Sequence, residues 1–502
     1  MAQLQKQSEK VDIARPLLKM ETPLFRALLL LGIIAALAPG VYSESEDMNS
    51  DTTGDSPTAA PLLYPAPDGE EPSAHYTLKV DGRPVFVYQA RVSAKPVNRV
   101  WDGRQRPLEQ TELAAFAYWD MSKPVQVEIS SARTVENVTV RPQSLGILPN
   151  VDGNTISFPL AAPANLVVEV NDIHHALHLF ANPPDESSRM SERPRVHYFG
   201  PGVHEPGDIV LESNETVYIA GGAVVHGVVR AARAENIRVL GRGVLDGSKV
   251  ERRESKNLLW FYECRNVLVS GIILRDPPVW AVLPKNCDGV WLSNVKLIGC
   301  WRYNSDGFDF VDCRDVHVSR CFVRSYDDSI VVKSFNEQGD DIQDVTVEDC
   351  VIWTDWGFSL GVTYETRTAR IRDLVFRNCD VIHNIVWRGT LAINPSDRAE
   401  ISNVLFENIR VEDARTGLIE LAIEETQWGT DDERGNIRGV VFKDITVTGG
   451  PFPSSVIRGY DETHGVGDVT IENLVIHGKQ ILNPEDGRFQ IGPHVKNVTF
   501  AP

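Results

Sequence analysis

Short segments of one recurring form fill the chain from about Gly200 onward. Each has the form polar–Val–x–apolar–x–x–x–apolar, as in NVLVSGIIL, DVHVSRCFV and DVTVEDCVI. The first apolar positions of these segments are 237, 267, 290, 316, 345, 374, 404, 440, 469 and 498, so successive intervals run from 23 to 36 residues. No helix-length period of 3.6 residues appears, and short β runs alternate with polar or Gly-containing turns. A repeat of this kind is typical of a parallel β-helix, in which each coil stacks on the previous one.

A different pattern precedes the repeat. Residues 76–182 contain alternating apolar and polar runs such as YTLKVDGRPVFVYQARV, VQVEISSA and NLVVEVND, with turn residues between them. This alternation predicts an antiparallel β-sandwich over residues 76–185. A connection, ANPPDESSRMSERPRV, then leads to the predicted β-helix over residues 195–502.

The first 75 residues have the composition of a targeting segment and a linker. Lys19 and Arg26 precede the apolar run ALLLLGIIAALAPGVYS at 27–43, which is shorter than the roughly 20 residues of a membrane span. Residues 1–45 therefore predict a secretory signal, with an N-terminal anchor as the alternative. Residues 46–75 are rich in Ser, Asp, Thr, Pro and Glu and predict a disordered linker. We expect a secreted or periplasmic protein that has no membrane contact once the signal is removed.

Composition narrows the partner classes. The chain has 502 residues, 42% of them hydrophobic, and a formal net charge of −19. Such an acidic chain is disfavoured as a general nucleic-acid binder, which needs a basic surface. Acidity also disfavours an extended anionic substrate unless local Lys and Arg side chains reverse the field.

Six of the seven cysteines follow the repeat. Cys264, Cys287 and Cys313 each lie three residues before a repeat position, and Cys321, Cys350 and Cys379 each lie five residues after one. Equivalent positions of successive coils stack about 4.8 Å apart. We expect two interior ladders of free thiols, with at least one disulfide as the alternative. No CxxC pair or His-rich spacing indicates a metal site.

The segment YNSDGFDFVDCRDVHVSRCFVRSYDDSIVVKS, residues 303–334, carries the candidate chemistry. Asp306 precedes the run GFDFV, and Asp327 and Asp328 precede SIVVK one coil later. Stacking is expected to place Asp306 beside Asp327, with Asp328 immediately following. Asp309 is expected to be turned away from the cluster, although alternation along DGFDF does not decide its face. Clustered carboxylates raise each other's pKa, and a protonated and an ionised carboxyl side by side are what glycoside hydrolysis requires. The alternative interpretation is ordinary turn aspartates, which punctuate every coil.

These motifs resemble glycoside hydrolase family 28, the polygalacturonase type. NSDGFD at 304–309 is similar to the family's Asn-x-Asp motif, and DDSIVVKS at 327–334 is similar to its Asp-Asp strand. The resemblance implies a right-handed parallel β-helix and inverting hydrolysis of a polysaccharide or oligosaccharide, with no metal or other cofactor. It implies Asp327 as the general acid, with Asp306 and Asp328 holding and deprotonating the water.

Two family motifs are altered. Trp356, in DWGFSLG, stands where the family's Gly-His-Gly motif has His. VWRGTLAINPSD offers only Arg388 for the Arg-x-Lys pair that cradles a galacturonate carboxylate in the family. The expected substrate is therefore either pectic or a neutral sugar. The layout of a sandwich followed by a β-helix is also similar to the dextranase and isopullulanase family, which cuts neutral α-glucans.

Other side chains are candidates for lining the groove. Aromatic faces stack on the apolar faces of sugar rings, and polar side chains bind hydroxyl groups. The candidates for substrate binding are Asn304, Lys333, Trp356, Arg388, Trp280 and Tyr303. Glu365, Glu420, Glu424 and Glu425 are expected in loops of later coils, and His383 is expected to be structural.

Two other functional classes stay open at this point. A polysaccharide lyase on the same fold would use a Lys or Arg base or Ca²⁺, and its products would absorb ultraviolet light. A glycan-binding β-helix without catalysis would release no new reducing ends. The set of Asp306, Asp327 and Asp328 argues against the second of these classes.

Overall fold

The computed structural model describes residues 60–94, 106–185, 190–254, 256–335, 341–385 and 388–502, all within one compact unit, Pro57–Pro502. The expected signal at residues 1–45 lies outside the described residues. Part of the predicted disordered linker is instead structured: Leu62–Leu63 pair with a strand of the sandwich, and Glu70 forms an ion pair with Arg275. Among the described residues, no helix has the length and apolar character of a membrane span.

Two sheets form the N-terminal sandwich and enclose an apolar core that includes Trp119, Phe158 and Leu179. One sheet has the order β1-β5-β11-β10-β7, with β4 also pairing with β5, and the other has the order β3-β2-β6-β9-β8. The pairing is antiparallel except between β5 and β11, which are parallel. The strands are β1 (Leu62–Leu63), β2 (Tyr76–Val80), β3 (Arg83–Val85), β4 (Tyr88–Ser93), β5 (Thr111–Asp120), β6 (Val125–Ser131), β7 (Val138–Arg141), β8 (Asn150–Asp152), β9 (Thr155–Leu160), β10 (Ala164–Val170) and β11 (Leu177–Asn182).

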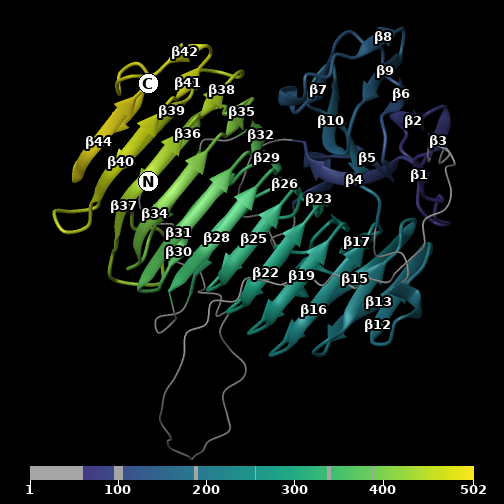
Figure 1. Cartoon of the computed structure of the whole chain (residues 1–502), viewed down its shortest axis with the longest axis horizontal. Coiled ribbons are helices and arrows are strands. Elements are labelled where there is room, and N and C mark those ends of the chain that lie inside the picture. The colour runs from purple at the N-terminus through teal and green to yellow at the C-terminus, as the bar shows by residue number, and fades with distance from the viewer. Residues whose placement is uncertain (1–59, 95–105, 186–189, 255, 336–340, 386–387) are drawn as a thin grey trace, which may run out of the picture. The chain divides into compact units, whose positions relative to one another are not determined.

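The remaining strands form parallel stacks, which confirms the β-helix (Figure 1). One stack is a sheet of 12 strands. Its strands are β12 (Val196–Phe199), β14 (Thr216–Ile219), β16 (Glu235–Gly241), β19 (Arg265–Ser270), β22 (Asp288–Ser293), β25 (Arg314–Ser319), β28 (Ile342–Glu348), β31 (Arg370–Arg377), β34 (Glu400–Glu407), β37 (Asn436–Lys443), β40 (Val466–Glu472) and β44 (Val495–Ala501).

Two further ladders branch from the long strands β13 (Gly202–Leu211) and β15 (Ala223–Ala232). The ladder that carries the candidate site contains β18 (Leu259–Tyr262), β21 (Val282–Lys285), β24 (Phe308–Val311), β27 (Ile330–Ser334), β30 (Leu360–Thr366), β33 (Gly389–Pro395), β36 (Gly417–Ala422), β39 (Ser454–Arg458) and β43 (Phe489–Ile491). The other ladder contains β17 (Val244–Asp246), β20 (Ile273–Arg275), β23 (Lys296–Ile298), β26 (Phe322–Ser325), β29 (Val351–Thr354), β32 (Asp380–Asn384), β35 (Arg410–Val411), β38 (Thr446–Val447), β41 (Val475–Ile476) and the antiparallel β42 (Lys479–Gln480). The helical segments are single 3₁₀ turns at Leu108–Gln110, Gln143–Leu145, Met190–Glu192 and Arg252–Glu254.

The repeat positions read from the sequence coincide with the register of the 12-stranded sheet. Ile237 pairs with Val267, which pairs with Val290, and the series continues without a break to Val498. Their side chains are buried in one core, so insertions of different length fall in the turns and leave the interior aligned. All seven cysteines are buried and free, which confirms thiol packing over a disulfide.

The outer face of the second ladder packs against the sandwich. Phe116 and Phe180 of the sandwich share an apolar cluster with Phe322, Trp353 and other residues of the β-helix. Buried charges also cross this contact, for example Arg242 with Asp120 at 3.0 Å. The ladder that carries the aspartates forms a different face of the β-helix from the one that packs against the sandwich.

Candidate active site

Parallel pairing brings the aspartates of two coils together. Phe308 pairs with Ile330, so Asp306, two residues before Phe308, lies level with Asp328, two residues before Ile330. The sequence interpretation had placed Asp306 beside Asp327, and the register corrects this by one residue. The backbone agrees, because the Gly307 N–H donates to the Asp328 carbonyl at 2.7 Å. All three predicted aspartates nevertheless gather at the start of adjacent strands.

Lys333 binds three carboxylates of the cluster. Its Nζ lies 3.2 Å from Asp306 Oδ2, 3.0 Å from Asp309 Oδ1 and 3.2 Å from Asp328 Oδ2. A fourth carboxylate, Glu365, lies 3.9 Å away. Burial alone would lower the Lys333 pKa, but these carboxylates raise it well above the usual value, so the ammonium stays charged.

Asp309 belongs to this cluster, which corrects the expectation that it points away. Its side chain is fully buried, and Lys333 is its ion-pair partner. Burial raises its pKa to about 7, opposed by Lys333 and assisted by the charge of Asp328. A signal was present in the sequence, because a charged residue inside the apolar run GFDFV is rare unless it is paired.

Asp328 is a hydrogen-bond acceptor for the next coil. The Phe358 N–H donates to Oδ1 at 2.9 Å, and the Thr363 hydroxyl donates to Oδ2 at 3.0 Å. The backbone of the next coil can approach because residue 357 is glycine: a Cβ there would lie 2.4 Å from the Asp328 nitrogen. Together with Lys333, these groups surround the Asp328 side chain with three donors.

Asp327 has a contrasting environment. It is half-buried, whereas Asp306 and Asp328 are buried. Burial is the main cause that raises its pKa to about 7, and the charge of Asp328 adds to the effect. Near neutral pH a substantial fraction of Asp327 therefore carries a proton. A carboxyl that carries a proton near neutral pH can serve as a general acid.

Asp306 is the most enclosed of the three predicted catalytic residues. Its Oδ2 accepts from Lys333 at 3.2 Å, and its Oδ1 is buried with no hydrogen-bond partner among the described residues. Burial raises its pKa well above the usual value, Lys333 lowers it, and the neighbouring aspartates raise it again. A buried acceptor without a partner is costly in a folded protein and is characteristic of a site that completes its bonds with a ligand or water.

The predicted substrate-binding residues have different surroundings. Trp280 is half-buried and its ring lies 4.6 Å from Lys333 Nζ, so it adjoins the aspartates. Asn304 occupies the turn before Asp306 with a positive φ of 56°. Tyr303 is buried in the core of the β-helix. Contact of these three residues with substrate stays a prediction, as does direct contact of Lys333.

The two positions at which family motifs are altered lie on the following coils. Trp356 is half-buried, packs against the core and directly precedes the Gly357 and Phe358 backbone that holds Asp328. Arg388 lies over the rings of Phe358 and Tyr364, at 5.4 and 5.2 Å. Both therefore adjoin the aspartate cluster.

Glu365 and Glu420 were expected in loops, and the structure corrects this. Glu365 lies on β30 and is buried, and Glu420 lies on β36. Glu420 accepts from the Gly389 N–H at 2.8 Å and from Asn394 Nδ2 at 2.7 Å. The sequence interpretation did not single out Asn394, which lies on β33.

Other charged groups lie away from these side chains. His383 is buried between Glu169 of the sandwich, at 2.5 Å, and Asp413, at 3.3 Å, which fits the structural role expected of it. Among the residues that the structure describes, no group of His, Cys, Asp and Glu is arranged to hold a metal ion.

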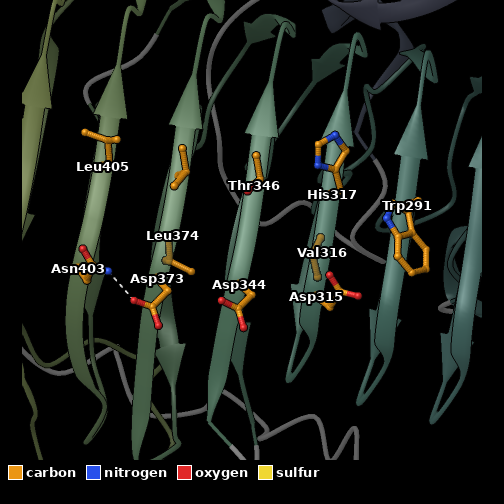
Figure 2. A pocket seen from close by; sticks show the side chains of 11 residues that line it. Trp291, Asp315, Val316, His317, Asp344, Thr346, Asp373, Leu374, Asn403 and Leu405 are labelled. Carbon is orange, nitrogen blue, oxygen red and sulfur yellow. Dashed lines mark hydrogen bonds between the residues drawn. The ribbon is translucent and has the colours of Figure 1, made fainter. Parts of the chain in front are cut away.

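A shallow concavity of about 420 Å³ lies on a different face from the aspartates, on the outside of the 12-stranded sheet (Figure 2). Asp315, Asp344 and Asp373 form one row there, and Trp291 stands at one end. These aspartates occupy equivalent positions on successive coils, one coil apart from each other. None of them contacts Lys333, and we therefore place the candidate active site at the Lys333 cluster.

Comparisons with known proteins agree with this fold and with the motifs. A family model described as "Glycosyl hydrolases family 28" matches residues 211–486. A relative from Aspergillus niger, "Putative galacturan 1,4-alpha-galacturonidase C", is 26% identical over 190 residues, which is 31% of this chain and 43% of that protein. The chain thus spans less than half the length of this curated relative.

Two solved structures align with this chain. An exopolygalacturonase from Thermotoga maritima aligns with a TM-score of 0.49 and 19% identity, over 62% of this chain and 86% of that one. Dex49A from Penicillium minioluteum aligns with a TM-score of 0.58 and 16% identity, over 89% of this chain and 97% of that one. At 16% identity the likeness to Dex49A concerns the fold alone.

Proposed function

The chain belongs to glycosyl hydrolase family 28, and we propose that it cleaves glycosidic bonds with inversion, through Asp327 as the general acid and Asp306 and Asp328 as the residues that activate water. It is a polygalacturonase-like glycoside hydrolase that acts on a polysaccharide. The observation that carries the proposed roles is the contrast between half-buried Asp327, with a pKa of about 7, and buried Asp328, whose oxygens lie within reach of three donors, the Phe358 N–H, the Thr363 hydroxyl and Lys333 Nζ.

The proposed reaction is a single displacement. Asp327 donates its proton to the glycosidic oxygen as the bond from that oxygen to the anomeric carbon breaks. A water molecule attacks the opposite face of the anomeric carbon, and its proton passes to the carboxylate of Asp306 or Asp328. The products are a free sugar hydroxyl and a hemiacetal of inverted configuration, and exchange with solvent restores both carboxyls.

Lys333 supports the division between acid and base among the aspartates, and it transfers no proton in the proposed reaction. Its charge favours ionised Asp306 and Asp328, which must accept the water proton. Its raised pKa also argues against the lyase alternative, because a lysine base must lose its proton near neutral pH. The absence of ultraviolet-absorbing products would accord with hydrolysis.

The substrate of the proposed reaction belongs to one of two classes. The name of the Aspergillus niger relative suggests galacturonate polymers. The layout of a sandwich followed by a β-helix, which resembles the dextranase and isopullulanase family, suggests a second class, the neutral α-glucans. A reducing-end assay over pectic, α-glucan and galactan polymers separates these classes, and NMR of the first product gives its anomeric configuration.

The test of the catalytic roles is Asp327→Asn. We expect turnover at least about a hundredfold lower, the usual scale for losing a general acid, with an unchanged thermal unfolding curve. Asp315→Asn is the matched control, because Asp315 is an exposed aspartate on another face of a neighbouring coil. Near-normal turnover of Asp327→Asn, or a product of retained configuration, would contradict the proposal.

We also propose that the protein is exported, from the charged flank and short apolar run at residues 19–43. Expression of the full chain in a secreting host, followed by N-terminal sequencing, tests this. Removal of residues up to about Ser43 is expected. Retention of an intact N-terminus in the membrane fraction would favour the anchor instead.

A further inference from the structure

The coils that follow the aspartate pair carry a second polar group on the same face. Asp309 pairs with Val331, and the row continues through Gly361 and Ala392 to Glu420. Two residues further along β30 and β33, Thr363 pairs with Asn394. The part of the site over β30, β33 and β36 is therefore built by Thr363, Asn394 and Glu420.

The cations in this part of the site are already paired with carboxylates. Arg388 lies 3.4 Å from Glu420 and 3.8 Å from Glu424. Arg458 lies 2.6 Å from Glu424. An incoming sugar carboxylate would have to displace these glutamates, and it would meet their charge at close range.

The polar atoms that remain suit hydroxyl groups. Asn394 is fully buried and donates its Nδ2 hydrogens to Glu420 at 2.7 Å and Glu424 at 3.0 Å. Its Oδ1 and the Tyr364 hydroxyl are buried without hydrogen-bond partners among the described residues. A hydroxyl group both donates and accepts, so it can satisfy Asn394 Oδ1, Tyr364 and a glutamate oxygen. A carboxylate only accepts, so it would leave Asn394 Oδ1 without a donor and would place its charge close to Glu420, which already accepts from Gly389 and Asn394.

We propose that the sugar unit held over β30, β33 and β36 is a neutral glycosyl residue, bound through its hydroxyl groups, with Glu420 and Asn394 as the residues that determine specificity. This inference rests on the hydrolytic function proposed above and names the substrate class of that site. It assigns Arg388 to the support of Glu420 and Glu424, in place of the role of gripping a uronate.

Binding to a matched pair of polymers tests the inference without requiring turnover. Polygalacturonate and the same polymer reduced at its carboxyl groups differ only in charge and in one hydroxyl at C6. The Asp327→Asn full chain is run through native gels that contain each polymer, or dextran, or an α-1,3-glucan. We expect retardation by at least one neutral polymer, with an affinity at least about tenfold above that for polygalacturonate. Equal or stronger retardation by polygalacturonate, or retardation by none of the neutral polymers, overturns the inference.

Glu420→Gln tests the named residue. The substitution keeps the size of the side chain and one oxygen that can still accept from the Gly389 N–H. It removes the negative charge and one of the two acceptor oxygens of the carboxylate. We expect the affinity for the neutral polymer to fall about tenfold, the scale of losing one charge-assisted hydrogen bond, and the preference over polygalacturonate to shrink. Glu425→Gln is the control, because it removes the same charge from an exposed neighbour. Unchanged affinity in a folded Glu420→Gln variant overturns the assignment.

Cleavage assays distinguish failure of the neutral-substrate inference from failure of the proposed hydrolysis. Wild-type cleavage of polygalacturonate that is abolished by Asp327→Asn would preserve the proposed hydrolysis while overturning the inference of a neutral substrate. Persistent cleavage by Asp327→Asn would instead overturn the proposed catalytic role of Asp327.

Discussion

Replacing Lys333 by Met removes the one positive charge that Asp306, Asp309 and Asp328 share. Met keeps the length of the side chain and an apolar contact with Trp280, so the change is mainly electrostatic. The three carboxylates lie 3.0 to 3.2 Å from the ammonium. With an effective dielectric constant of about 20, two unit charges at that distance interact by about 5 kcal/mol.

The expected result is a displaced pH–activity profile. An opposite charge at close range lowers a carboxyl pKa by about 1–3 units, and its removal raises the pKa by a similar amount. The residue that takes the proton from water must be ionised, so the acidic limb of kcat/KM should move up by at least about one pH unit. A shift of one pH unit corresponds to about 1.4 kcal/mol. This is less than the Coulomb energy of about 5 kcal/mol for each pair, because neighbouring carboxylates can share protons and so relieve part of their repulsion.

Stability should change with a defined sign. Breaking a buried ion pair costs about 3–5 kcal/mol when the partner charges stay buried. In Lys333→Met the folded pKa values of Asp306 and Asp309 are raised further above their unfolded values of about 4. The variant should therefore lose stability relative to the wild type as pH rises through about 4 and above, and the deficit should be smallest in acid.

The assays are kcat/KM from pH 4 to 9 on a cleaved polymer and thermal unfolding by circular dichroism over the same range. Lys79→Met is the control, because Lys79 is an exposed lysine of the sandwich paired only with Glu128. An acidic limb that stays within about 0.3 pH units of the wild type, in a folded Lys333→Met protein, would refute the electrostatic role of Lys333.

Two further substitutions test other parts of the structure. Gly357→Ala places a Cβ 2.4 Å from the Asp328 nitrogen and 2.5 Å from its Oδ1. Because this displaces Asp328, kcat should fall at least about tenfold with little change in KM. A fall in kcat together with a comparable rise in KM would indicate general misfolding instead. Hydrogen bonds to Asp413 and Glu169 raise the His383 pKa although burial alone would lower it, so its stabilising contribution is complete below about pH 6.5 and is lost as pH rises through the folded pKa. In thermal unfolding from pH 6 to 9, His383→Gln should therefore lose less stability than the wild type, by about 1.4 kcal/mol for each unit of pKa shift, and parallel profiles would count against the charged His383.

The repeat could be read from the sequence because the interior of a β-helix imposes one rule on every coil. Each buried position must align with its equivalents, so Ile237, Val267 and their successors mark the register even where the intervals differ. The cysteine columns followed from the same rule. Parallel pairing of β5 with β11 in the sandwich has no comparable local signal, since the two strands are distant in sequence and no turn joins them.

Lys333 and Trp280, both candidates from the sequence, lie beside the clustered aspartates, but the places of Asp309 and Glu365 were not predicted. Alternation fails at the start of β24, where the strand begins just after the turn that holds Asp306, so the face of Asp309 could not be decided from Asp306. The position of Glu365 depends on a register irregularity between β27 and β30, where Val332 and Ser334 are out of step with their partners. Such irregularities arise from packing between coils, which single-strand patterns do not contain.

One consequence of the fold explains how two consecutive aspartates can have different surroundings. Asp327 and Asp328 lie in the bend between β26 and β27. Asp328 accepts from the backbone of the next coil and from Thr363 and pairs with Lys333, whereas Asp327 is half-buried. The buried charge of Asp328 in turn raises the pKa of Asp327. The stacking of coils that surrounds Asp328 with donors therefore also places it where it helps to keep a proton on Asp327.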